Sequence, residues 1–112
     1  GLIIAGGTDA PVEIGDPRIE FYAAVTRMDV DGYHGEGWNL DQKITRFEAL
    51  KMFTIWPAIA SFQEDVKGTI EVGKLADFSI FDSDLMLAPE NQILNSKNIL
   101  TIVGGRIVFQ AL

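Results

Sequence analysis

The first 62 residues contain a single predicted strand, and this imbalance limits what they can fold into. Residues 2–6 form the short apolar run "LIIAG", which is too short for a helix and ends at a glycine pair. The patterns that follow, up to about residue 62, are helical or typical of loops. Because one strand cannot form a sheet alone, we expect residues 1–62 to need partners from a longer protein.

Two helices have clear start signals. Asp16 and Pro17 have the pattern of an N-cap followed by a proline at the first helical position, and the apolar pattern after them predicts a helix ending near Met28. Further along, Thr45 and Glu48 form a capping box, in which each side chain satisfies a free backbone N–H of the other. Between these helices, residues 29–43 are polar and glycine-rich, which predicts a surface loop.

Pro57 interrupts the second helical pattern. A proline inside a helix lacks the N–H donor and clashes with the preceding turn, so we expect a break or kink there, with Trp56 pushed out of helical geometry. A short helix over Ala58–Phe62 is expected to follow.

From Lys67 onward the pattern becomes that of strands. Gly68 and Gly73 are expected at turns, and alternation of side chains predicts a strand over residues 75–82. The segment "ILTIVGGRIVFQ" predicts two strands joined by a tight hairpin, since two adjacent glycines supply the positive φ angles that such a turn requires.

Composition excludes several classes of function. The chain has 112 residues, is 47% hydrophobic and 22% charged, and carries a formal charge of −7. This acidity argues against nucleic acid or an anionic membrane as a partner, because phosphate binding requires a basic patch. The absence of cysteine excludes disulfides and thiol catalysis. No apolar run approaches the roughly 18 residues that span a bilayer.

Two loop features resemble metal sites and are better explained otherwise. His34 is the one histidine, so an ordinary zinc site cannot be built from this chain alone, and a solvated loop histidine is expected. Asp29, Asp31 and Glu36 suggest a calcium loop, but no glutamate stands at the twelfth position, and a solvated loop is the better explanation.

Asp9, in "GGTDAP", is the candidate catalytic residue. A carboxylate that follows a buried parallel strand occupies the place where barrel enzymes put reactive groups, and it could ligate a cation and accept a proton from water. The alternative is an Asx-turn before Pro11, since aspartate also favours turns. The motif alone leaves both open.

The downstream segments carry a specific resemblance. The stretch "KGTIEVGKLADFSIFD" resembles a signature near the C-terminus of amidohydrolase-superfamily enzymes, through Gly68, Gly73, Lys74, Ala76, Asp77 and Asp82. The segments "TIVGGRIVF" and "ITRFEALKMFTIWPAIA" resemble the family's closing strands and the helix before them. "GTDAPVE" with "PRIEFYAAVTR" is similar to the amidohydrolase 3 branch.

This resemblance implies an α/β plus β fold. Residues 1–66 would form the C-terminal end of a (β/α)₈ TIM-barrel hydrolase domain, with Leu2–Gly6 as the last strand. Residues 67–112 would form the C-terminal share of a small composite β-sandwich. The glycine, lysine and aspartate of "GKLAD" are then expected to build the sandwich, with Gly73 at positive φ and with Lys74 and Asp77 fixing the turn.

The resemblance also implies an activity. Asp9 falls on the family's aspartate that binds metal and activates the hydrolytic water, so Asp9 is both the catalytic and the metal-ligand prediction. The parent would be a hydrolase of amide or cyclic amide C–N bonds that uses a divalent metal, zinc in the first instance, on a small-molecule substrate. The isolated chain, which lacks the family's histidine ligands, is expected to be inert and to hold no metal.

Two further expectations stand beside this one. A non-catalytic regulatory or interaction protein that retains the amidohydrolase fold is the alternative, because fold does not fix function. In addition, the apolar faces of residues 2–6 and of the second helix would lack cover in the isolated chain, so self-association is expected.

Overall fold

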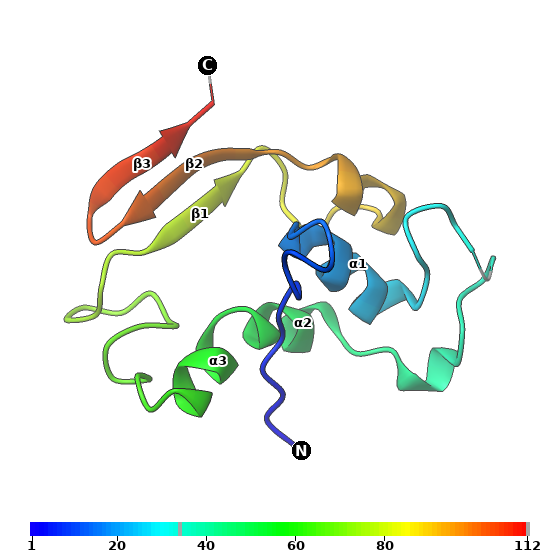
Figure 1. Ribbon diagram of the computed structural model, residues 1–112, viewed down its shortest axis with the longest axis horizontal. Coiled ribbons are helices and arrows are strands. Elements are labelled where there is room, and N and C mark those ends of the chain that lie inside the picture. The colour runs from blue at the N-terminus through cyan, green and yellow to red at the C-terminus, as the bar shows by residue number, and fades with distance from the viewer. Residues whose placement is uncertain (34, 112) are drawn as a thin grey trace.

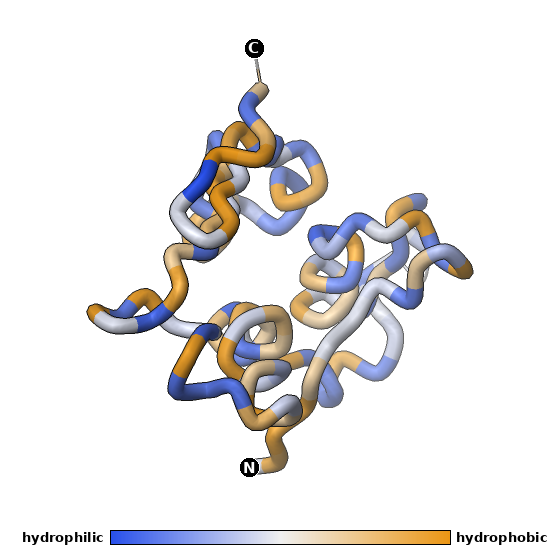
Figure 2. The backbone as a smooth tube through the Cα atoms, turned by 60° about the vertical axis from the view of Figure 1, so that its left-hand side comes forward, coloured by the Kyte–Doolittle hydropathy of each residue, from blue (hydrophilic) through white to orange (hydrophobic). Residues whose placement is uncertain are grey.

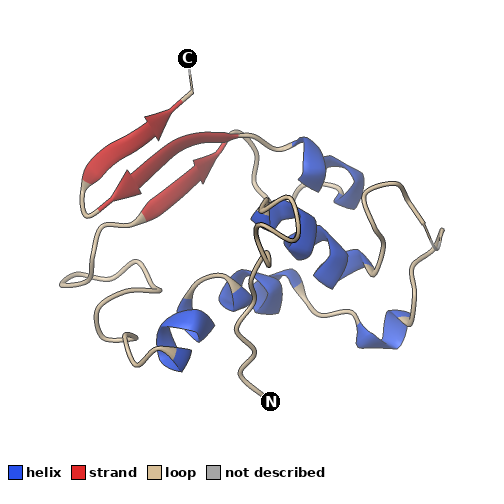
Figure 3. Cartoon of the chain, in the orientation of Figure 1, coloured by secondary structure: helices blue, strands red, loops and turns tan. Residues whose placement is uncertain are grey.

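The computed structural model describes residues 1–33 and 35–111, and its helices and strands occupy different parts of the molecule. Three α-helices come before the strands along the chain, a 3-10 helix lies between the first two strands, and the strands gather at one end (Figure 1, Figure 3). None of the helices in the described residues has the length and apolar character needed to cross a membrane. The elements are α1 (Pro17–Thr26), η1 (Leu40–Gln42), α2 (Arg46–Met52), α3 (Ile55–Ala60), β1 (Phe78–Phe81), η2 (Glu90–Asn95), β2 (Asn98–Val103) and β3 (Arg106–Gln110).

The three strands form one antiparallel sheet in the order β1-β2-β3. The predicted hairpin is confirmed, since β2 and β3 are joined at Gly104 and Gly105, whose φ angles are +56° and +77°. The strand predicted over residues 75–82 is present but shorter, and it pairs with β2 from Phe78 to Phe81.

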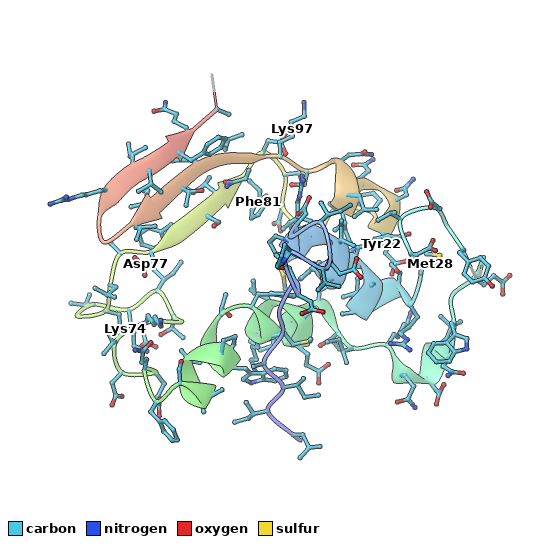
Figure 4. All side chains as sticks on the ribbon, viewed as in Figure 1. Tyr22, Met28, Lys74, Asp77, Phe81 and Lys97 are labelled. Carbon is cyan, nitrogen blue, oxygen red and sulfur yellow. The ribbon has the colours of Figure 1, made fainter. Side chains whose placement is uncertain are left out.

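The turn before the sheet has the structure that the "GKLAD" segment predicts. Gly73 has φ +97°, a value that favours glycine. The Lys74 ammonium donates to the Thr69 hydroxyl at 2.6 Å and forms an ion pair with Glu71 at 3.2 Å. Lys74 therefore holds residues 69–74 together, as predicted (Figure 4).

Asp77 acts on a different turn from the one expected. Its carboxylate accepts a hydrogen bond from the Gly104 N–H at 2.7 Å, and beside it the Gly105 N–H donates to the Ala76 carbonyl at 2.9 Å. These two bonds link the entrance of β1 to the β2–β3 hairpin. The aspartate of the signature is thus a long-range brace for the hairpin.

The core lies where α1 meets α2 and η2. Phe21, Tyr22 and Val25 form one face of α1 and are buried against Ala49 of α2 and Ile93 of η2. Since Ile93 belongs to the connection between β1 and β2, this small core joins the helical half to the sheet half. Figure 4 labels Tyr22 on the α1 helix at this junction.

The predicted N-cap of α1 is confirmed and extends into a wider polar contact. Asp16 accepts hydrogen bonds from the backbone N–H and the Nε–H of Arg18, at 3.0 and 2.9 Å. The side-chain hydrogen bond from Arg18 lowers the pKa of Asp16 below its usual range. The guanidinium of Arg18 also donates to the Ser96 carbonyl, just before β2. A single side chain thus connects the start of α1 to the sheet.

The capping box at Thr45 and Glu48 is confirmed, but the prediction for the following residues is wrong. The helix breaks at residues 53–54, and Trp56 and Pro57 both lie inside α3. A proline clashes with the carbonyl four residues earlier, here that of Phe53, so the break falls one turn before the proline. Pro57 then occupies the first turn of α3, where its missing N–H would have no helical partner in any case.

The strand predicted over residues 2–6 is not formed, and this prediction is wrong for the chain as it stands. The segment is extended but pairs with no strand of the described residues, and it is exposed, with Leu2 85% accessible. Figure 2 shows the hydrophobic colouring of the tube next to the N-terminus. The strand does not form because, within the described residues, no second strand lies beside the segment to pair with its backbone N–H and C=O groups. Self-association through such faces stays a prediction.

We predict that Asp77→Ala lowers the free energy of unfolding by about 0.5–1.5 kcal/mol, because the Gly104 N–H loses its acceptor. Urea unfolding followed by circular dichroism measures the change. Asp31→Ala is the matched control, since its carboxylate accepts no recorded hydrogen bond within the described residues. Equal losses in the two variants would contradict the bracing role.

A second prediction concerns pH. Because the folded-state pKa of Asp16 lies below its unfolded value of about 3.9, its contribution to stability is present above that value and is lost as pH falls through the lower, folded-state pKa. Thermal unfolding between about pH 5 and pH 2 should therefore show a smaller acid destabilisation in Asp16→Asn than in the parent chain, by about 0.5–1 kcal/mol. Superimposable pH profiles would exclude this contribution, and Asp31→Asn serves as the control.

Candidate functional site

The segment that carries Asp9 is fixed at its front end by a close backbone approach. The Gly6 N–H donates to the Met52 carbonyl at the end of α2, at 2.8 Å. A Cβ on Gly6 would lie 3.2 Å from that carbonyl oxygen and from the ring of Phe53, which is tighter than an ordinary contact. Glycine at this position therefore allows the apolar segment to lie against α2.

Asp9 itself begins a backbone turn. Its carbonyl accepts hydrogen bonds from the N–H groups of Val12 and Glu13, at 2.9 and 3.2 Å. Its φ angle is +49°, in the left-handed region that aspartate tolerates better than most residues. The chain then reaches Asp16, which starts α1, so Asp9 stands between two anchored points.

The carboxylate of Asp9 takes no part in this turn. Among the residues that the structure describes, it has no recorded hydrogen bond or ion pair, and the residue is exposed. The Asx-turn alternative requires the carboxylate as acceptor, whereas the backbone carbonyl makes the observed bonds. The geometry therefore leaves both carboxylate oxygens available to a group from outside the chain.

A single carboxylate can serve as one metal ligand, but it cannot form a metal site by itself. Its oxygens suit a divalent cation, but a catalytic zinc site commonly uses three protein ligands. Within residues 1–33 and 35–111, no three histidine, cysteine, aspartate or glutamate side chains gather as they would for a metal ion. Asp9 alone therefore offers one oxygen-donor side chain, too few for a metal site within the described residues.

The acidic loop that resembles a calcium site has a structural explanation. The Asp29 carboxylate accepts hydrogen bonds from the N–H groups of Asp31 and Tyr33, at 3.0 and 2.7 Å, and so braces its own loop. The prediction for His34 lies outside the described residues. The base of the loop is closed by Arg27, whose guanidinium lies 5.2 Å from the ring centre of Trp38.

A groove of about 400 Å³ lies beside the Asp9 turn, and sequence reasoning missed it. Its walls come from the end of the turn, from α1, and from the loop after α1, through Glu13, Ile14, Ile19, Glu20, Ala23, Arg27, Met28, Asp29, Val30 and Trp38. One sequence signal could have revealed this groove. Ile19 and Ala23 form a second apolar stripe on α1, beside the stripe that is buried in the core.

Comparisons with known proteins agree with the sequence resemblance. The model of the Amidohydrolase family matches residues 1–109. The chain is 30% identical over 110 residues to the putative amidohydrolase YtcJ of Bacillus subtilis and 29% identical over 110 residues to the N-substituted formamide deformylase of Arthrobacter pascens. It is 30% identical over 124 residues to a 5-methylthioadenosine/S-adenosylhomocysteine deaminase of Caldanaerobacter subterraneus. No solved structure gives a significant match.

These matches cover the chain almost fully and the relatives only in part. In each case 98% of the chain is aligned, against 21%, 20% and 27% of the respective relative. The chain thus spans about a fifth to a quarter of the length of the curated relatives it matches. Since the family model covers nearly every residue, the chain belongs to the amidohydrolase superfamily, in its amidohydrolase 3 branch.

Proposed function

We propose that this chain is the C-terminal portion of a metal-dependent amidohydrolase that hydrolyses the C–N bond of a small amide or cyclic amide. Three curated relatives, an amidohydrolase, a formamide deformylase and a deaminase, support hydrolysis at carbon–nitrogen bonds. The observation that carries the proposal is the Asp9 carboxylate, which is exposed and uncommitted at the end of an apolar segment.

The fold proposal follows from the same membership. Residues 1–66 would complete a (β/α)₈ barrel and residues 67–112 would complete a β-sandwich, each with residues from outside this chain. The exposed apolar segment 2–6 supports this, because it is extended and pairs with no strand of the described residues. The apolar residues exposed on β3, Ile107, Val108 and Phe109, support it for the sandwich.

Asp9 would have two tasks in the parent enzyme. It would be one ligand of a divalent metal, zinc in the first instance, while the other ligands come from outside residues 1–112. Such an ion, when bound, supplies an acidified water and polarises the substrate carbonyl. The Asp9 carboxylate would accept a proton from the attacking water and return it to the departing nitrogen, which would otherwise leave as an unstable anion.

The position of Asp9 suits this proton transfer. The bonds from Val12 and Glu13 to its carbonyl fix its backbone, and the contact of Gly6 with Met52 fixes the segment before it. A general base must be held within hydrogen-bond reach of its proton, and a turn anchored on both sides provides this hold without occupying the carboxylate.

We predict that Asp9→Asn in the full-length parent reduces hydrolysis of N-acyl amines or cyclic amides, assayed with added zinc, by at least about 100-fold. The amide cannot accept the proton, yet it has nearly the same shape. Asp31→Asn, in the exposed loop, should retain the parent's rate. Hydrolysis that is unaffected by Asp9→Asn would refute the assignment.

We also predict that the 112-residue chain alone is inert and binds divalent metal weakly at best, because it offers a single suitable ligand. Calorimetric titration with zinc at micromolar concentration should show no stoichiometric binding. Tight binding of one zinc ion per chain, abolished in Asp9→Asn, would contradict this prediction.

A further inference from the structure

The Asp9 turn opens a small loop that closes again before α1 begins. Its first part is the turn itself, in which the Val12 N–H donates to the Asp9 carbonyl at 2.9 Å. At the other end, a Cβ on Gly15 would lie 3.2 Å from the Cβ of Ala10, so the two ends of the loop are in contact. Residues 11–14 therefore project from a narrow base, and Asp9 is the residue directly before that base.

Two apolar side chains are exposed on this loop to a similar degree. Val12 is 78% accessible and Ile14 is 83% accessible. Their surroundings differ, because Ile14 lines the groove beside α1, whereas Val12 is not among the residues that line it. Single exposed apolar side chains are common on protein surfaces, so exposure alone gives Val12 no role. Its position relative to Asp9 distinguishes it from Ile14.

The hydrogen bond that closes the turn keeps Val12 close to Asp9. A four-residue turn holds the Cα atoms of its first and last residues within about 7 Å of each other. The substituents of an amide begin at the two atoms of the C–N bond that is cleaved. A substrate placed for proton transfer to Asp9 therefore brings the first atoms of a substituent within reach of a side chain that starts this near the base.

The charges of the loop restrict which substituent is accepted. Asp9 and Glu13 are both exposed carboxylates, and no lysine, arginine or histidine precedes Arg18 in the sequence. Arg18 is already engaged, since its Nε–H donates to the Asp16 carboxylate at 2.9 Å. A substituent that carries a carboxylate would meet like charges here and find no counter-ion on the loop. The loop therefore favours an uncharged substituent.

We propose that Val12 determines specificity, because its side chain contacts an uncharged apolar substituent on the amide bond that is hydrolysed. This inference rests on the proposed function, in which Asp9 is the base. Small-molecule sites commonly combine apolar side chains with a few polar groups that fix the substrate. Asp9 would act on the C–N bond, while Val12 would select the substrate by the group attached to that bond.

The test measures selectivity in the full-length parent with added zinc, using the hexanoyl, acetyl and succinyl para-nitroanilides as probes. The parent should have its highest kcat/KM for the hexanoyl probe and its lowest for the succinyl probe. Val12→Ala should lower the ratio of the hexanoyl to the acetyl value by about 10-fold, because apolar contact with the longer chain is lost. Ile14→Ala, on the same loop and equally exposed, is the matched control and should keep the parent's ratio.

A second variant separates lost contact from a disturbed turn. Val12→Thr is similar in shape but places a hydroxyl against the substituent, so it should lower the same ratio. An unchanged ratio in both Val12 variants, or an equal fall in Ile14→Ala, would overturn the role of Val12. A parent enzyme that prefers the succinyl probe would overturn it as well.

Asp9→Asn distinguishes this inference from the proposed function on which it rests. If Asp9→Asn hydrolyses the probes at the parent's rate, or if the parent hydrolyses none of them, the proposed activity fails and the inference fails with it. If Asp9→Asn is inactive while the Val12 variants keep the parent's selectivity, the proposed activity stands and the role of Val12 alone is refuted.

Discussion

The contact of α1 with the connection between β1 and β2 holds the two halves of this chain together. Arg18 donates to the Ser96 carbonyl while it pairs with Asp16, and one turn further along α1 the core residues pack on Ile93. On the other side of the connection, the Asp82 carboxylate accepts from the Lys97 N–H at 2.8 Å. A further bond from the Arg46 guanidinium of α2 to the Leu85 carbonyl, at 2.8 Å, strengthens the same junction. The position of the Asp9 turn depends on this junction as well, since it leads directly into α1.

Local features could be predicted from the sequence because their causes are local. The cap at Asp16, the capping box at Thr45 and the hairpin at Gly104 each depend on residues within a few positions of one another, and all three are observed. A break in the helix was predicted at Pro57, but it lies about one turn earlier, at residues 53–54. The steric conflict acts on the carbonyl of Phe53, four residues back, and the chain resolved it there.

The long-range features could not be predicted in this way. The strand expected over residues 2–6 depends on neighbours, and an apolar run alone does not provide them. The hydrogen bonds that Gly104 donates to Asp77 and that Arg18 donates to Ser96 join residues 27 and 78 positions apart, and no spacing rule indicates them. The candidate site shows the same limit. Its one predicted residue, Asp9, lies on a locally determined turn, and within the described residues its carboxylate has no recorded hydrogen bond or ion pair.

The residues that reveal the family and the residue that would carry its chemistry are therefore different. Gly73, Lys74 and Asp77 make the "GKLAD" signature recognisable, and each has a structural task in the turn or the hairpin. Such residues are retained for the fold whether or not a protein still catalyses a reaction. The Asp9 carboxylate is a different kind of signal, because the backbone carbonyl of Asp9 makes the hydrogen bonds of its turn and the carboxylate makes none of them within the described residues. The proposed catalysis therefore depends less on the strong signature than on the short stretch "GGTDAP", where the Asp9 carboxylate is exposed and has no recorded partner within the described residues.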